Sequence, residues 1–338
     1  MSYVYILIFV ILAGFIIVVG KKLSLYGDAI GDLMGIEKSW IGIVMLAAVT
    51  SLPEMVTSIS ATLMGNPQMA VSNIFGSNLF NIFVVFILDI FVLKSTSFSS
   101  KVSSRNFMAG FWSIILTLIF LLGFSFPTEE IMNISLFSLI ILGVYFIAMK
   151  SIYIYEHQKN DEFSQKLEEE IKEFHEVEEN GISLPQAKKG FAMSAFFIVI
   201  LGTGLSFVGD KIANTPFFGI ELGESFVGLM LIALATSLPE LTVSIEAIKL
   251  KSYDMAAGNL LGSNIFNIMI IFITDLFLRD QNIYQSLGGF HKLTAIFSML
   301  ILLVFMMGIM FKNKKRRYDT YIIGLVYFVA MYILYIKR

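Results

Sequence analysis

An acidic motif inside an apolar segment constrains this sequence more than any other feature. The motif TSLPE, residues 50–54, lies within an apolar run from about Trp40 to Leu63, and a helix needs only about 20 such residues to cross a bilayer. A carboxylate at the centre of a spanning helix costs about 2.5–3.5 kcal/mol, and Pro53 frees backbone carbonyls from their helical partners. Such groups are tolerated at membrane depth only where they face protein or water. The segment therefore predicts a polar site enclosed within a membrane protein.

The same motif recurs at residues 236–240, and the similarity around it is extensive. Shifting the sequence by 186 residues (240 minus 54) aligns 42–89 with 228–275 without a gap, and nearly half of the aligned positions are identical. Self-similarity on this scale indicates a duplicated unit. The second copy carries its own proline, Pro239, so two interrupted helices are expected.

The composition indicates a membrane protein with many spans. Of the 338 residues, 57% are hydrophobic and 15% are charged, and the mean hydropathy is +0.79, whereas soluble domains carry about 25% charged residues. Apolar runs predict ten spans. They lie near residues 4–24, 39–64, 67–93, 107–125, 130–150, 190–210, 224–248, 254–278, 292–311 and 319–336.

Each repeat contains five predicted spans, which determines how the halves are related. Because five is odd, the second unit must enter the membrane from the opposite side, and transporters built this way bind their substrate near the midplane on interrupted helices. The predicted fold is an all-α membrane protein with ten transmembrane helices arranged as two inverted-topology five-helix repeats. The first repeat covers residues 1–150, a linker covers 151–189 and the second repeat covers 190–338.

Basic residues in the loops predict the orientation. One set of alternate loops collects most of them, including Lys38, Arg105 and the run 312–317, and such loops face the cytoplasm. We therefore expect a multi-pass protein of the cell membrane with both termini extracellular and the 151–189 loop cytoplasmic. Lys21 and Lys22 follow the first apolar run instead of preceding it, which predicts a retained helix and not a cleaved signal peptide.

The linker has a helical pattern of its own. Its apolar residues recur at helical spacing among many Glu and Lys residues, which predicts an amphipathic cytoplasmic helix; they are Phe163, Leu167, Ile171, Phe174 and Val177. The loop could sense cations, or it could be a solvated connector. The connector is the preferred interpretation because the loop lacks the ligand spacing of a calcium-binding loop.

Several functional classes are disfavoured by what the chain contains. It has no cysteine, which excludes thiolate metal sites, disulfides and cysteine nucleophiles, and no basic face is available for nucleic acid. An intramembrane enzyme with a serine nucleophile would need a general base, yet the histidines, at 157, 175 and 291, lie in or near loops. A passive cation channel remains an alternative, although an inverted repeat favours alternating access.

Polar residues around the two motifs share helical faces. In the first repeat they are Ala47, Thr50, Ser51 and Glu54 on the second span with Ser77 and Asn81 on the third; in the second repeat they are Ala233, Thr236, Ser237, Glu240, Ser263 and Asn267. They supply carboxylates, hydroxyls, amides and, from the two alanines, backbone carbonyls. Oxygen ligands of this kind suit hard cations such as calcium and sodium, not zinc or copper.

The two glutamates stand out within this set. No buried basic residue matches Glu54 or Glu240 in the sequence, and an unpaired buried carboxylate needs a cation or a proton. Asn73 and Asn259 are expected to make hydrogen bonds between helices. Asp89 and Asp275 lie near span ends, and we expect them at the membrane interface.

At these residues the sequence resembles the calcium/cation antiporter superfamily, in particular the prokaryotic sodium/calcium exchanger type. The resemblance covers essentially the whole chain, and the doubled TSLPE with the doubled GSN-x-F-N is highly specific. It implies that Glu54 and Glu240 are the central calcium and sodium ligands and that the other ten residues complete the ion sites. It also implies that the first and sixth helices slide over the core to alternate access.

The resemblance implies a sodium/calcium antiporter without a cofactor, whose partners are Ca²⁺, Na⁺ and the lipid bilayer and which is expected to function as a monomer. Val49 and Ala235 stand where many relatives have Gly, and Asn267 stands where some exchangers have Asp. The site then holds two carboxylates and no third acid. A proton/calcium or other divalent cation exchanger on the same fold remains the alternative.

Overall fold

The computed structural model describes residues 2–94, 96–126, 130–131, 133–167, 182–213, 230, 232–278, 281–311 and 318–337. Within these residues nine helices are long and apolar enough to cross a membrane. The predicted span 224–248 lies partly outside them, and its described part consists of α10 and α11. The predicted all-α fold is confirmed, since the described strands are two residues long and form one small hairpin, β1 with β2.

The elements of the first half are α1 (Ser2–Met34), α2 (Lys38–Trp40), the π-helix η1 (Ile41–Leu46), α3 (Ala47–Thr50), α4 (Leu52–Leu63), α5 (Pro67–Ile87), the π-helix η2 (Leu88–Leu93), the 3₁₀-helix η3 (Ser104–Asn106), α6 (Phe107–Gly123), β1 (Glu130–Ile131), β2 (Ile134–Ser135) and α7 (Leu136–Leu167). Those of the second half are α8 (Leu184–Ala213), α10 (Ala233–Thr236), α11 (Leu238–Lys249), α12 (Tyr253–Phe277), α13 (Ile283–Ser286), α14 (Gly289–Phe311) and α15 (Tyr318–Lys337).

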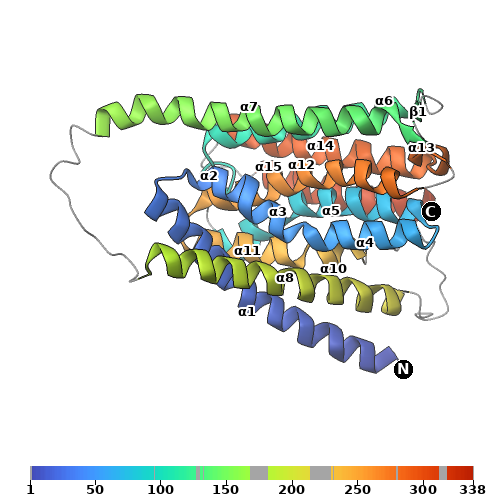
Figure 1. The fold of residues 1–338 in the computed structure, drawn as a ribbon, viewed down its shortest axis with the longest axis horizontal. Coiled ribbons are helices and arrows are strands. Elements are labelled where there is room, and N and C mark those ends of the chain that lie inside the picture. The colour runs from blue at the N-terminus through green and yellow to red at the C-terminus, as the bar shows by residue number, and fades with distance from the viewer. Residues whose placement is uncertain are drawn as a thin grey trace.

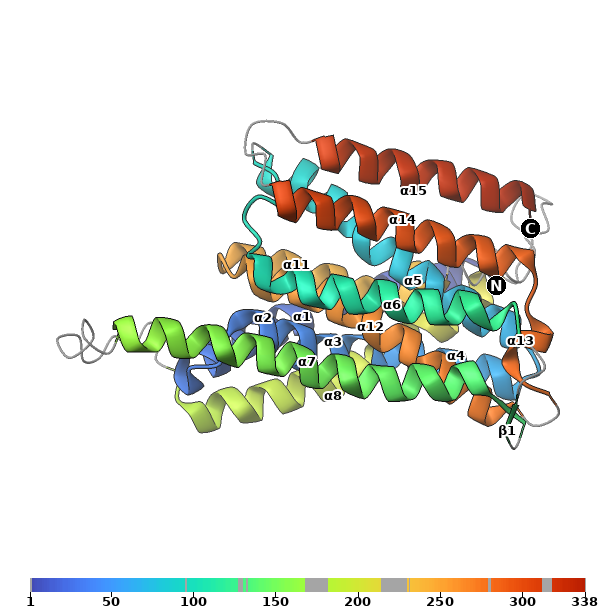
Figure 2. The same ribbon diagram turned by 90° about the horizontal axis from the view of Figure 1, so that it is seen from above.

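Helices α5 and α12 form the centre of the bundle, and each packs against helices of the opposite half. Helix α5 packs against α14 and α15, whereas α12 packs against α6 and α7. Helices α1 and α8 lie side by side on one face, with α1 against α11 and α8 against α4 (Figures 1 and 2). Each half therefore packs on the other in the same way, as expected for two inverted copies of one unit.

The two ends of the chain lie at the same end of the bundle (Figure 1). Helix α7 ends and α8 begins at the opposite end. A chain that crosses the membrane an even number of times must have both of its ends on the same side. The helical part of the linker reaches Leu167 in α7, and residues 168–181, with most of the predicted amphipathic helix, lie outside the described residues.

The first helix is longer than predicted. We expected it to end near residue 24, yet α1 continues to Met34. Its buried residues Ile16, Leu23 and Ile30 recur every two turns, so one packed stripe continues past the basic pair at 21–22. Gly35, with φ of +63°, follows in the left-handed conformation that commonly ends a helix.

The second and eighth spans approach each other through their backbones. A Cβ placed on Gly42 of η1 would lie 2.3 Å from the carbonyl oxygen of Met255 and 3.0 Å from the Cα of Gly258 in α12. A Cβ on Gly258 would lie 2.5 Å from the carbonyl oxygen of Ser39. Only glycine fits this contact, which holds the interrupted second span directly against α12.

Asp89 and Asp275 are both fully buried within the protein. Their carboxylates accept hydrogen bonds from loop backbone. Asp89 accepts from the Phe98 N–H at 2.6 Å. Asp275 accepts from the N–H groups of Ser135, at 2.8 Å, and Ile283, at 2.6 Å. Each aspartate thus fixes the loop that follows its own span.

The Asp275 interaction also joins the halves, since Ser135 precedes α7 of the first repeat. Asp275→Ala leaves two buried N–H groups without this acceptor, and hydrogen bonds to charged groups contribute about 1.5–3 kcal/mol each. We expect a clearly lower midpoint of thermal unfolding in detergent. Asp32→Ala is the control, because that side chain is 64% exposed and pairs with Lys38 at the surface, where an ion pair contributes about 0–1 kcal/mol. Equal midpoints for the two variants would contradict this account.

Candidate functional site

The two TSLPE motifs interrupt their helices in the same way. Ser51, between α3 and α4, has φ −90° and ψ 0°, and Ser237, between α10 and α11, has φ −86° and ψ 8°. A proline stands near the start of each following helix. It is tolerated there because the first N–H groups of a helix have no acceptor within the helix. The first turns of α4 and α11 therefore begin inside the bundle.

Glu54 and Glu240 lie in these first turns, and both are fully buried. The amino-terminal end of a helix carries partial positive charge, which favours a carboxylate there. Each glutamate accepts a hydrogen bond from the serine three residues before the other one, since Ser237 bonds to Glu54 and Ser51 bonds to Glu240. No described ion pair includes either of them, since those in the described residues involve other acids.

Each carboxylate accepts hydroxyl hydrogen bonds from both halves. Glu54 Oε1 accepts from Ser237 at 3.1 Å and from Ser77 at 3.4 Å. Glu240 Oε1 accepts from Ser51 at 3.1 Å and from Ser263 at 3.4 Å. The two pairs of hydrogen bonds are related by the 186-residue shift, and their donor–acceptor distances are the same. The arrangement therefore has an approximate twofold axis between the carboxylates.

The two threonines of the motifs lie beside them. Thr50 donates to Asn259 Oδ1 at 3.3 Å and lies 3.4 Å from the Ser263 hydroxyl. Thr236 donates to Asn73 Oδ1 at 3.3 Å and lies 3.4 Å from the Ser77 hydroxyl. Because the two asparagines contact threonines of the opposite half, they make the interhelical hydrogen bonds expected of them and also form the wall of the site.

The predicted alanine carbonyls have partners within their own helices. The Ala47 carbonyl accepts from the Ser51 N–H at 3.0 Å and from the Thr50 hydroxyl at 3.4 Å. The Ala233 carbonyl accepts from the Ser237 N–H at 2.9 Å and from the Thr236 hydroxyl at 3.2 Å. They lie one turn before the breaks, and binding an ion through them requires the threonine hydroxyls to turn away.

Four buried side-chain oxygens at the site have no hydrogen-bond partner within the described part of the chain: Oε2 of Glu54, Oε2 of Glu240, Oδ1 of Asn81 and Oδ1 of Asn267. They form two pairs related by the repeat. A buried polar atom without a partner costs about 1–3 kcal/mol, and more when it is charged. Four acceptors, with no cationic side chain paired to the carboxylates among the described residues, make a site suited to a cation.

The structure thus brings all twelve predicted residues to the two helix breaks and the adjacent parts of α5 and α12. Sequence reasoning gave no role to Asn78 and Asn264, which lie in the same GSN-x-F-N motifs and hydrogen-bond to Asn267 and Asn81. Their identity in both copies was the available signal. No described cluster contains three or more His, Cys, Asp or Glu residues, because this site combines two acids with amides and hydroxyls.

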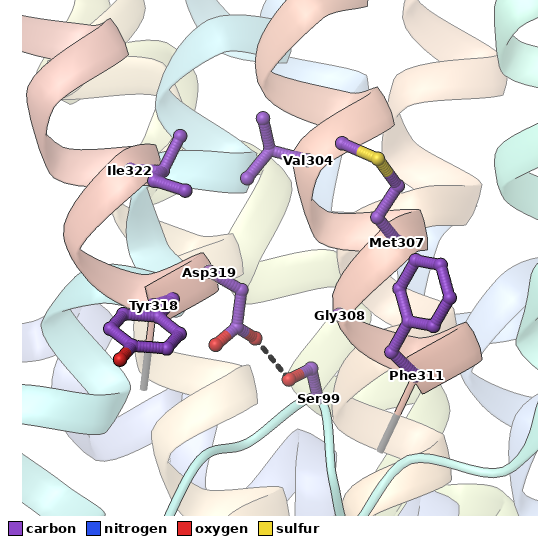
Figure 3. Close-up of a pocket in the computed structure, with 8 residues that line it drawn as sticks. All are labelled: Ser99, Val304, Met307, Gly308, Phe311, Tyr318, Asp319 and Ile322. Carbon is purple, nitrogen blue, oxygen red and sulfur yellow. Dashed lines mark hydrogen bonds between the residues drawn. The ribbon is translucent and has the colours of Figure 1, made fainter. Parts of the chain in front are cut away.

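A cavity of about 340 Å³ lies elsewhere, between α14 and α15 (Figure 3). Its main polar feature is Asp319, which accepts hydrogen bonds from Ser97 at 3.1 Å and from Ser99. Most of its other lining side chains are apolar, and the lining contains no second acid among the described residues. We therefore place the candidate cation site at the helix breaks and not in this cavity.

Proteins similar to this chain are named as antiporters and exchangers. The putative antiporter CaxA of Alkalimonas amylolytica is 24% identical over 97% of this chain and 98% of its own. The sodium/calcium exchanger MaX1 of Methanosarcina acetivorans is 33% identical over 34% of each chain.

The fold matches a solved exchanger, and the family model matches both halves. The sodium-calcium exchanger NCX_Mj, soaked with Na⁺ and Sr²⁺, superposes with a TM-score of 0.69 at 20% identity, over 98% of this chain and 99% of that one. The model described as "Sodium/calcium exchanger protein" matches residues 4–153 and 189–336, well over half of the chain. The chain therefore belongs to the sodium/calcium exchanger protein family, and it is a multi-pass cation/calcium antiporter and not an enzyme.

Proposed function

We propose that the protein exchanges Ca²⁺ for Na⁺ across the cell membrane, by alternating access to a site built on Glu54 and Glu240. The observation that carries this proposal is the set of four buried oxygens without partners, two from the carboxylates and two from Asn81 and Asn267. Carboxylate and amide oxygens are ligands that calcium prefers, and it takes about 6–8 of them. Two negative charges balance one divalent ion.

The remaining predicted residues supply further oxygens for the same ions. Hydroxyls of Thr50, Ser51, Ser77, Thr236, Ser237 and Ser263 lie within hydrogen-bond distance of the carboxylates or of each other, so small rotations turn their lone pairs toward an ion. Carbonyls of Ala47 and Ala233 join them when the threonine hydroxyls turn away. Oxygen alone, without imidazole or sulfur, favours Ca²⁺ and Na⁺ over softer metals.

Coupling follows from competition for the same two acids. One Ca²⁺ or several Na⁺ ions can neutralise the carboxylate pair, but both cannot occupy it together. A bare pair of buried carboxylates is costly to enclose, so the change of access is favoured when cations neutralise it. Each crossing of the membrane then carries one kind of ion, which is what exchange requires.

Helices α1 and α8 are placed to carry out this change. A Cβ on Gly202 of α8 would lie 2.5 Å from Cγ of Pro53, and one on Gly20 of α1 would lie 2.7 Å from Cγ2 of Thr242. The pair therefore packs closely on the segments that begin at the two breaks. We propose that sliding of α1 and α8 over these contacts opens the site to one side at a time.

Further parts of the proposal concern setting and assembly. We propose that both termini are extracellular and that the 151–189 linker is cytoplasmic, as the loop charges predict, with residues 1–150 and 190–338 as the two repeats. The two ends of the chain lie at one end of the bundle, whereas α7 ends and α8 begins at the other (Figure 1). This arrangement supports placing the termini and the linker on opposite sides of the membrane. We further propose that the monomer is the working unit, that no cofactor or nucleic acid takes part, and that the linker is a connector.

Calcium uptake under imposed gradients tests the coupling ion. Purified protein in proteoliposomes is expected to drive Ca²⁺ uptake when the lumen contains Na⁺ and the bath does not, with little uptake under a pH gradient alone. Equal internal and external Na⁺ is the control and should give no net uptake. Uptake driven only by the pH gradient would reject sodium coupling and favour the proton/calcium exchanger. Calcium flux with no counter-ion at all would indicate a channel.

A further inference from the structure

Four asparagine side chains form hydrogen bonds across α5 and α12, within one turn of Ser77 and Ser263, which bond to the two carboxylates. Asn81 donates from Nδ2 to Asn264 Oδ1 at 3.1 Å, and Asn267 donates from Nδ2 to Asn78 Oδ1 at 3.0 Å. Each of these bonds joins one repeat to the other. All four side chains are at most 2% exposed, so water contributes little to their orientation.

Asn78 and Asn264 are in turn held by the backbone. Asn78 donates from Nδ2 to the carbonyl of Asn264 at 3.2 Å, and Asn264 donates from Nδ2 to the carbonyl of Asn78 at 3.4 Å. An amide group that donates through its nitrogen to a carbonyl must present its oxygen on the other side. The Oδ1 atoms of Asn78 and Asn264 are therefore fixed as acceptors for the other two amides.

The orientation of Asn81 and Asn267 decides whether they can bind a cation. With Nδ2 directed at Asn264 or Asn78, the remaining Oδ1 atom has no partner among the described residues and is available as a ligand. Rotation of the amide by half a turn would present two N–H groups to the ion instead, which repel it. A single acceptor on the opposite helix prevents this rotation in each case.

We propose that Asn78 and Asn264 are positioning residues that fix the amide oxygens of Asn267 and Asn81 toward the transported cation. The inference rests on the proposed function, because it needs a cation at Glu54 and Glu240. It assigns each positioning residue to the opposite repeat: Asn78 acts through Asn267, 189 positions away in sequence, and not through Asn81 on its own helix.

The first test measures calcium binding to the purified full-length protein in detergent, by isothermal titration with CaCl₂ in sodium-free buffer. Partners that orient metal ligands contribute about 10–100-fold to affinity, so Asn78→Ala and Asn264→Ala are each expected to raise the Kd by that factor. Asn78→Asp keeps an acceptor for Asn267 and is expected to bind at least as tightly as the unmodified protein. Asn106→Ala is the matched control, since this buried asparagine bonds to Asp254 instead, at 2.9 Å.

A double-mutant cycle separates positioning from a general structural role. If Asn78 acts through Asn267, then Asn78→Ala has little further effect on the Kd once Asn267→Ala is present. In an Asn81→Ala background it should keep most of its effect. A structural role would instead weaken binding by the same factor in both backgrounds, which would overturn the inference.

The outcomes distinguish this inference from the proposed function. Absence of calcium binding by the unmodified protein would reject the proposed function itself. Calcium binding that is lost in Glu54→Gln but unchanged, within twofold, in Asn78→Ala would overturn the inference alone. If Asn78→Ala is not monodisperse by size exclusion, Asn264→Ala with Asn81→Ala gives the mirror-related cycle, and weakened binding by a folded Asn78→Asp protein would be equally decisive against the inference.

Discussion

Glu54→Gln and Glu240→Gln are each expected to abolish sodium-driven calcium flux in proteoliposomes while leaving the fold intact. Glutamine keeps the shape of the side chain and an oxygen that can accept from the serines, but it removes one of two negative charges facing a divalent ion. A unit charge pair about 4 Å apart contributes about 4 kcal/mol at an effective dielectric constant near 20, or roughly a thousandfold in affinity.

Glu246→Gln is the matched control for this experiment. Glu246 lies on α11, as Glu240 does, but it pairs with Lys249 at 2.7 Å. Its replacement should leave calcium flux within about twofold, because surface ion pairs contribute about 0–1 kcal/mol. Normal flux in both Glu54→Gln and Glu240→Gln would remove the two acids from the transport mechanism, whereas loss of flux in all three variants would point to instability.

Gly42→Ala is expected to have the largest effect on folding. Its new methyl group would meet three backbone atoms of α12, the nearest at 2.3 Å, and backbone cannot rotate away as a side chain can. Inserting a methyl into a packed core costs about 1–3 kcal/mol, occasionally more, and this contact should reach the upper end. We expect a sharply lower yield of monodisperse protein and a lower unfolding midpoint.

Gly14→Ala is the control, because a Cβ there has nothing within 4 Å. It should fold as the unmodified protein does, since alanine favours a helix over glycine by about 1 kcal/mol. A normal midpoint for Gly42→Ala would show that the second span and α12 can separate without loss of stability. Helix α12 carries Ser263 and Asn267 of the candidate site, so any such separation should also widen that site.

The repeat allowed much of this arrangement to be predicted from sequence. A carboxylate in an apolar run must be enclosed, because exposing it to lipid is energetically costly. Two copies of the motif in an inverted repeat are expected to meet near the midplane. The positions of Glu54 and Glu240 followed from these two arguments. The positioning roles proposed for Asn78 and Asn264 did not follow. An amide can donate or accept, and the sequence does not say which edge of the amide faces its neighbour.

Hydropathy also carries little information about hydrogen bonding. It gave no sign that Asp89 and Asp275, which end apolar runs, are fully buried and bind loop backbone. The end of α1 was placed too early because the apolar run of the first span ends near residue 24, whereas the helix continues to Met34. Helix packing, which continues through Leu23 and Ile30, outweighed that local signal.

The matched hydrogen bonds at the two breaks have a consequence for the sense of operation. Ser51 and Ser237 bond to the opposite glutamates at the same length, 3.1 Å, and Ser77 and Ser263 bond to the glutamates of their own halves at 3.4 Å. Because the hydrogen bonds at the two breaks are equivalent, they favour neither direction of ion movement. Under the proposed function, the ion gradients across the membrane therefore determine which ion moves inward.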